Sequence, residues 1–301
     1  MEIIVAENCQ NKHWFDAQID FIKAIICHLL FENHIESLRY FVIADSETET
    51  FIETVNEYGT LLHRNIVTEN TDQYQVTAQS IEGTDNEGNY CQAIIIKSAL
   101  LIAIMSLFDK SKPSDEESIQ MQAFGITIVM HEIGHAIDNQ NIYNSLGRVN
   151  TQVAFNLSNP IERESFFIQS SISLWGEFFA ERFPYKHFPI FKEVLDSKEE
   201  TLIECIDSYY GENISITDRI YRILYFFVHI IARNNEIGFD FEQYKLTGLN
   251  QYASFLKEFE VEMFNFSSKY PNCNFNEDIS GLKDIYMKMY WFEIEKRKEI
   301  Q

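Results

Sequence analysis

Cysteine is scarce in this chain, and its placement argues against a disulfide framework. The 301 residues include five cysteines, an odd number of widely spaced residues that form no CxxC pair. This pattern is typical of reduced structural thiols. Glycine-rich phosphate loops and nucleophile elbows are also absent, so the sequence gives no support to phosphate-loop or serine-hydrolase chemistry.

Basic residues are few as well. Lys and Arg number 24 against 46 Asp and Glu, which gives a formal net charge of −22. A nucleic-acid backbone would be repelled by such a chain, so we expect no nucleic-acid partner. The acidic balance would attract a basic peptide or protein substrate, and solubility alone would also account for it.

No apolar run in the sequence is long enough to span a membrane. The longest, Ala93 to Phe108, contains Lys97 and two serines and falls short of the roughly 18 uninterrupted apolar residues that a span needs. The first residues, MEIIVAENCQ, have neither a basic start nor a small-residue cleavage site. We therefore expect synthesis in the cytoplasm without a signal peptide, with any export by a route that needs none.

The sequence does contain the motif His131-Glu132-Ile133-Gly134-His135, within ITIVMHEIGHAIDN. On an α-helix, positions i and i+4 share a face, so His131 and His135 can bind one divalent metal ion together. Glu132 lies about 100° around the helix, where its carboxylate can take a proton from metal-bound water. Composition predicts roughly 0.02 chance occurrences of this pattern. We therefore predict a Zn²⁺ site on a buried helix.

A catalytic zinc ion usually has three protein ligands, so a third donor is expected downstream. The segment NPIERESFFIQSSISLWGEFFAERF predicts a helix from about Pro160 to Phe183, with Asn159 and Glu162 as capping residues. An apolar stripe runs along one side of this helix. Glu177 lies on the opposite side, among small residues that would let another helix approach, and we predict it as the third ligand.

A carboxylate beside the metal site would orient a ligand. Glu181, one turn after Glu177, is predicted to accept a hydrogen bond from the outer nitrogen of a zinc-bound imidazole. Asp138 is an alternative for this role. Both residues could equally face solvent.

These two stretches resemble the catalytic domain of anthrax lethal factor and its relatives, zinc metallopeptidases of the gluzincin type. That family carries HEFGHAVD followed at a comparable distance by EFFAE, where this chain has HEIGHAID and EFFAE. Outside these stretches only the order of elements is compatible. The resemblance implies Zn²⁺ held by His131, His135 and Glu177, with Glu132 as general base.

The chain departs from that family at one position. Where the family has a tyrosine thought to stabilise the transition state, this chain has Ser170. A donor to the developing oxyanion must then come from elsewhere. The possible donors that we consider are Tyr143, Tyr185, His187 and His229.

The remaining pattern predicts an α+β fold: a small mixed sheet with an edge hairpin packed on helices that include the HExxH helix, followed by an all-helical C-terminal region. We assign residues 1–189 to a catalytic domain and 190–301 to a helical subdomain or extension. The predicted strands are Glu2–Glu7, Leu38–Ala44, Leu61–Val67 and the hairpin Tyr74–Ile81 with Tyr90–Lys97. The predicted helices include His13–His34, Ser46–Tyr58, a long helix opened by Ser114, Ile190–Tyr210, Thr217–Arg233, Asn250–Lys269 and Leu282–Lys298. The hairpin is either purely structural or an edge to which an extended peptide could pair.

The motifs together predict a zinc-dependent endopeptidase that uses metal-activated water and a glutamate base. The alternative is a zinc-stabilised binding or regulatory protein with weak or no catalysis. The missing tyrosine favours this alternative, and the intact Glu132 opposes it. The sequence leaves the substrate and the oligomeric state open.

Overall fold

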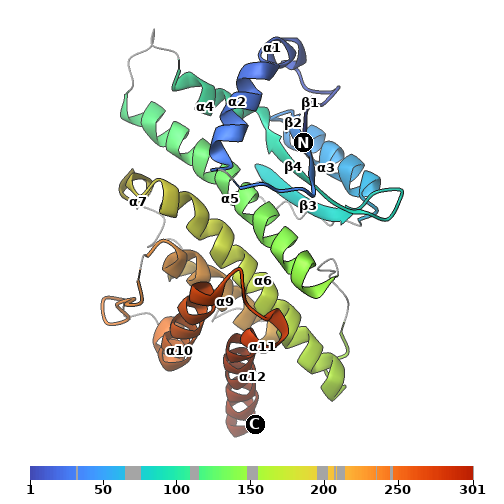
Figure 1. Cartoon of the computed structure of the whole chain (residues 1–301). Coiled ribbons are helices and arrows are strands. Elements are labelled where there is room, and N and C mark those ends of the chain that lie inside the picture. The colour runs from blue at the N-terminus through green and yellow to red at the C-terminus, as the bar shows by residue number, and fades with distance from the viewer. Residues whose placement is uncertain are drawn as a thin grey trace. The chain divides into compact units, whose positions relative to one another are not determined.

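The computed structural model describes residues 1–31, 33–64, 76–108, 115–147, 155–194, 203–206, 208, 214–234, 236–244 and 247–300 (Figure 1). The chain divides into two compact units. The first is Met1–Tyr143 with Phe183–Leu195, and the second is Asn144–Arg182 with Asp196–Gln301. The predicted boundary at residue 189 differs from this division, in which residues 144–182 belong with the helical rear. The assignment of residues 190–301 to a helical subdomain or extension stays a prediction.

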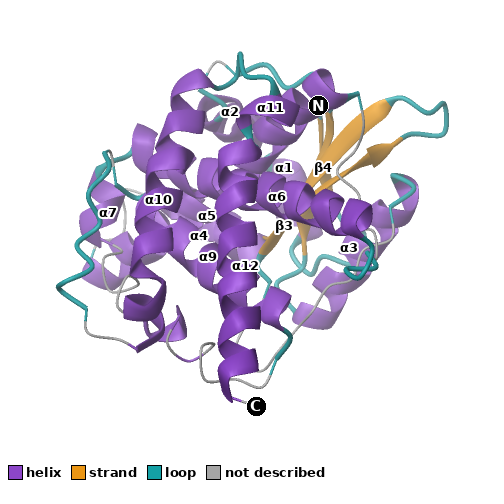
Figure 2. Ribbon diagram, turned by 90° about the horizontal axis from the view of Figure 1, so that it is seen from below, coloured by secondary structure: helices purple, strands orange, loops and turns teal. Residues whose placement is uncertain are grey.

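The first unit contains a four-stranded mixed sheet with the strand order β1-β2-β4-β3. Figure 2 shows its strands in orange. The strands are β1 (Glu2–Val5), β2 (Leu38–Ala44), β3 (Ala78–Thr84) and β4 (Tyr90–Lys97). β2 pairs in parallel with β1 and β4, whereas β3 pairs antiparallel with β4. The predicted α+β class, mixed sheet and edge hairpin are therefore confirmed.

The hairpin strands differ in how well the sequence predicted them. β4 has the predicted bounds, but β3 starts at Ala78 and ends at Thr84, later than predicted at both ends. Asp85 explains the late end, because its carboxylate accepts the backbone N–H groups of Glu87 and Asn89 and so closes a short turn. Residues 74 and 75 of the predicted strand lie outside the described residues.

The central strands are buried on both faces. Three consecutive residues of β2, residues 41–43, and three of β4, residues 94–96, are fully buried. Such continuous apolar runs are typical of parallel strands that helices cover on both sides. α3 (Thr48–Leu61) and α4 (Ser98–Ser106) contact the sheet. This covered sheet supplies the core of the first unit.

Two local predictions in the first unit were wrong. The expected helix over His13–His34 is two helices, α1 (Lys12–Ala17) and α2 (Ile19–Leu29), because Gln18 between them has φ −108° and ψ 7°. The expected strand Leu61–Val67 begins inside α3, which continues past Gly59 to Leu61. The last residues of that predicted strand, 65–67, lie outside the described part of the chain.

The helix that carries the histidine motif is α5 (Glu116–Leu146). Asp115 caps its start by accepting the backbone N–H of Ser118 at 2.8 Å, whereas the predicted capping residue Ser114 lies outside the described residues. The fully buried Gln92 of β4 donates to the Ala136 carbonyl at 2.9 Å and to the Ser37 hydroxyl at 2.8 Å. One side chain thus fixes α5 to the sheet beside the motif.

The glutamate-bearing helix is α6 (Pro160–His187). It begins as predicted, with the Asn159 side chain accepting the Ile161 N–H at 3.0 Å. The predicted end at Phe183 was wrong, because the helix continues through Pro184. A proline removes one helical hydrogen bond, and here it does so in the last turn, where little helix follows. α7 (Ile190–Val194) follows, and within the predicted helix 190–210 the described helical residues are 190–194, 203–206 and 208.

The secondary-structure elements described in the second unit are all helices, as predicted. Its other helices are α9 (Ile216–Ala232), α10 (Thr247–Lys269), α11 (Phe275–Asp278) and α12 (Ser280–Ile300). Aromatic side chains fill its core: the Trp175 ring lies 4.6 Å from Phe266, and Phe167 lies 5.0 Å from Tyr286. Among the described helices, none is long and apolar enough to cross a membrane.

The link between Gln92 and α5 can be tested by substitution. Gln92→Leu keeps a similar volume but removes both hydrogen bonds, so we expect a loss of about 1–3 kcal/mol in the free energy of unfolding. Urea unfolding followed by circular dichroism measures this loss. The control is Gln79→Leu on the half-buried edge strand β3, with an expected change within about 0.5 kcal/mol. Equal effects of the two substitutions would show that the link to α5 is not important.

Candidate metal centre

The two histidines of the motif lie on one face of α5, as their spacing predicts. The Nε2 atoms of His131 and His135 are 3.0 Å apart, and the ring centroids are 4.7 Å apart. The opposite faces of the helix are core, because Val129, Met130 and Ile133 are fully buried. Helix burial therefore directs both imidazoles to the same side.

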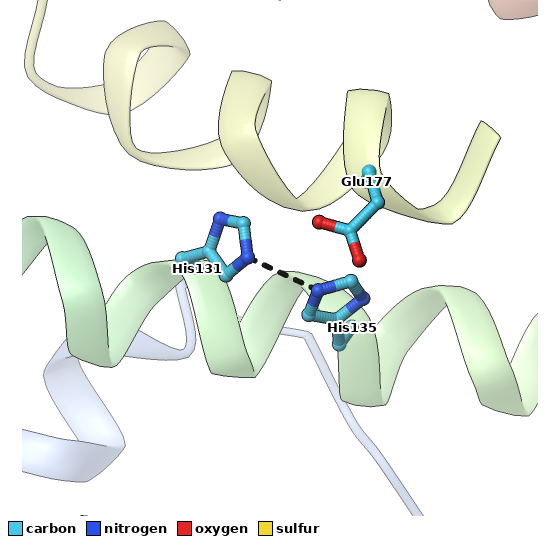
Figure 3. A group of neighbouring side chains, drawn as sticks. All are labelled: His131, His135 and Glu177. Carbon is cyan, nitrogen blue, oxygen red and sulfur yellow. Dashed lines mark hydrogen bonds between the residues drawn. The ribbon is translucent and has the colours of Figure 1, made fainter. Parts of the chain in front are cut away.

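The carboxylate of Glu177 on α6 completes a group of three possible metal ligands. Each residue offers one ligand atom, and these atoms all lie within 4.8 Å of one another. Figure 3 shows the carboxylate pointing toward the two imidazoles. The residues that the sequence analysis chose as ligands are thus the ones that converge.

The group fits a zinc ion in donor type and spacing. Tetrahedral zinc bound by two imidazoles at about 2.0–2.1 Å places their nitrogens about 3.3 Å apart. The observed Nε2 separation of 3.0 Å is close to this value. Two imidazoles and one carboxylate also leave one tetrahedral position for water. The three ligand atoms lie within 4.8 Å of one another, so binding an ion would draw the carboxylate and the imidazoles closer together.

Glu132, the predicted general base, lies next to His131 on α5 and is only 9% exposed. A carboxylate at this position stands beside the ligand pair without sharing their face of the helix. Asp138, the alternative orienting carboxylate, is fully buried on the same helix. Its predicted role stays a prediction.

Glu177 has a close partner on α9. The Nε2 atom of His229 lies 3.5 Å from Glu177 Oε2, and its Nδ1 atom lies 3.2 Å from Glu181 Oε2. The other oxygen of Glu181 receives Nε and Nη2 of Arg233, both at 2.9 Å. These contacts give Glu181 partners that the sequence analysis did not foresee. Its predicted hydrogen bond to a zinc-bound imidazole stays a prediction.

The carboxylates determine the charge of His229. Burial by itself would lower the pKa of this imidazole, but its contacts with Glu177 and Glu181 outweigh burial and raise the pKa to about 9. The raised pKa favours the imidazolium form of His229, which can donate from both nitrogens.

Tyr221 was missed by the sequence analysis. Its hydroxyl lies 3.0 Å from the Ser173 hydroxyl, one helical turn before Glu177 on α6. Burial, and secondly the Glu177 carboxylate, raise the pKa of Tyr221 to about 12. The phenol thus stays protonated at neutral pH and can donate. The signal in the sequence was the spacing of Tyr221, Tyr225 and His229, which share one helical face.

The other proposed oxyanion donors lie in aromatic surroundings or in the core. Tyr143 stacks on Tyr90 with ring centroids 3.9 Å apart. His187 stacks on Phe31 at 4.0 Å, and burial, followed by the charge of Lys186, lowers its pKa. Tyr185 is 5% exposed. Their role as oxyanion donors, like that of His229, stays a prediction.

Comparisons of the chain with protein-family models, with curated proteins and with solved structures gave no match. The resemblance to lethal factor therefore rests on the two short motifs alone.

Metal analysis tests the three converging residues. We expect one Zn²⁺ per chain, and we expect His131→Ala, His135→Ala and Glu177→Ala each to weaken binding by more than about 100-fold. This loss exceeds the 10–100-fold typical of losing an outer partner of a ligand. Competition with a chromophoric chelator measures the affinity. The control His28→Ala removes an exposed histidine and should leave the affinity unchanged. Equal affinities in wild type and all three variants would exclude the site.

Proposed function

We propose that this protein is a zinc-dependent endopeptidase, with Zn²⁺ held by His131, His135 and Glu177. The convergence of these three ligand atoms is the observation that carries the proposal. Two histidines and one glutamate form an established ligand set of catalytic zinc in metallopeptidases. The order HExxH followed by a glutamate on a later helix supports the same reaction class.

When bound, Zn²⁺ supplies a water with a pKa lowered toward about 7 and polarises the substrate carbonyl. Glu132 takes a proton from the attacking water and later donates it to the leaving amine. Its low exposure supports this role, because a proton held on a sheltered carboxylate exchanges less readily with bulk water. The net reaction adds water across a peptide bond.

The charge of the chain supports a preference among substrates. With a formal net charge of −22, the protein attracts cationic chains over long range and repels anionic ones. We therefore propose peptides or proteins with basic segments as substrates. High ionic strength would weaken this preference by screening.

A second function is favoured by one observation. Ser170 lies buried on α6, on the side that carries Glu177, at the position where the resembled family has a tyrosine. A hydroxyl on so short a side chain reaches less far than a phenol. A zinc-stabilised binding or regulatory protein without efficient turnover is therefore the competing proposal.

Substitution of Glu132 separates the two functions. Glu132→Gln keeps the size and hydrogen-bonding shape of the side chain but cannot accept the proton. We expect metal binding to persist and peptide hydrolysis to fall by about 10²–10⁴-fold. The assay is chelator-sensitive cleavage of a mixed peptide library, read by mass spectrometry together with metal content.

The matched control is Glu117→Gln, an exposed glutamate on the same helix, which should change neither metal content nor cleavage. Undiminished cleavage by Glu132→Gln would refute the general-base assignment. A zinc-loaded wild type that cleaves no member of the library would favour the binding protein instead.

A further inference from the structure

Four charged or chargeable side chains form a row along α6 and α9 in the second unit. Glu177 and Glu181 are four residues apart on α6, and His229 and Arg233 are four residues apart at the end of α9. Their side chains are only 20%, 9%, 12% and 10% exposed. The row therefore lies largely out of contact with solvent.

The four side chains contact one another in sequence, from Arg233 through Glu181 and His229 to Glu177. Arg233 binds one oxygen of Glu181 through two nitrogens at 2.9 Å. The second oxygen of Glu181 lies 3.2 Å from His229 Nδ1, and His229 Nε2 lies 3.5 Å from Glu177 Oε2. Each side chain thus contacts the next, and an ion-pair contact with His229 brings Glu177 into the row.

Burial makes these contacts energetically important. A carboxylate taken out of water without a partner is costly, and two carboxylates at i and i+4 on a helix repel each other. The imidazole lies against both carboxylates, and the arginine forks onto one of them. Removing His229 would leave Glu177 without this contact while Glu181 kept Arg233.

Glu177 also belongs to the group of possible metal ligands. Because the row and the candidate metal site share this residue, the row can orient one of the metal ligands. A carboxylate has two oxygens, so one can accept a hydrogen bond while the other ligates. Ligating carboxylates in metal sites are commonly oriented in this way by outer partners. A merely structural row would have no reason to end on a ligand.

We propose that His229 is a positioning residue for the metal site: anchored by Glu181 and Arg233, it holds Glu177 Oε2 so that Oε1 is presented to the ion. The inference rests on the proposed function, because it assumes that Glu177 is a ligand. It adds a role for α9, from which the sequence analysis chose no metal ligand.

Two substitutions at the same position test this role. His229→Leu removes the N–H groups at similar volume, and we expect the Zn²⁺ affinity to fall by about 10–100-fold. His229→Gln places an amide N–H near the position of Nε2, so its affinity should recover to within a few-fold of wild type. The full-length protein is titrated with Zn²⁺ against a competing chelator. The absorption spectrum of the Co²⁺-loaded protein reports changes in ligand geometry.

The matched control is Arg219→Gln, on the same helix. Arg219 lies 3.3 Å from the buried Glu293, in an ion pair that contains no metal ligand. We expect this variant to lose thermal stability but to keep the wild-type Zn²⁺ affinity and Co²⁺ spectrum. Loss of affinity in the control equal to that of His229→Leu would overturn the proposal, because general loosening would then explain both.

The remaining outcomes are distinct. A wild type that binds no metal refutes the proposed zinc site, and the positioning role with it. A wild type that binds, with His229→Leu unchanged or with His229→Gln equally weakened, overturns only the positioning role. If His229→Leu does not fold, Glu181→Gln is measured instead. An affinity lower by about 10-fold supports the chain of contacts, and an unchanged affinity overturns it.

Discussion

The approach of two imidazole nitrogens to 3.0 Å on α5 is the constraint on which the rest of the candidate centre depends. Such proximity requires an unbroken helix, because only there do residues four apart share a face. It also requires the other faces of the helix to be fixed. The fully buried Val129, Met130 and Ile133, with the Gln92 hydrogen bond to Ala136, meet that requirement.

For Glu177 the constraint is different: a charged carboxylate must be accommodated on a helix, α6, whose neighbouring residues are core. Its sequence neighbours Trp175 and Phe178 are fully buried, and the Glu177 side chain itself is only 20% exposed. The second unit resolves this by supplying polar groups from α9, a tyrosine hydroxyl near Ser173 and an imidazole at Glu177. The packing that shields Glu177 from solvent thus also places polar groups of α9 against it.

The sequence predicted most accurately what is encoded locally. β2 and β4 have their predicted bounds because each is a continuous apolar run, with β2 ending before Asp45 and β4 starting directly after the turn at Asp85. The histidine motif needs only helical periodicity. The break at Gln18 and the passage of α6 through Pro184 were missed, because tertiary packing overrides local preference there. Contacts between α6 and α9, such as that of Arg233 with Glu181, could not be predicted from the sequence. They join residues far apart in sequence, and no local pattern specifies them.

The polar stripe of α9 shows why periodicity alone misleads at such a site. Its apolar face is fully buried at Ile223, Leu224 and Phe227, and the opposite stripe of Tyr221, Tyr225 and His229 would ordinarily be assigned to solvent. Instead, Tyr221 and His229 contact polar residues of α6. An amphipathic helix inside a core still separates its faces, but its polar face meets fixed groups rather than water. The Tyr221 phenol of α9 therefore lies at Ser173, one turn before Glu177, on the side of α6 where position 170 carries only the short hydroxyl of Ser170.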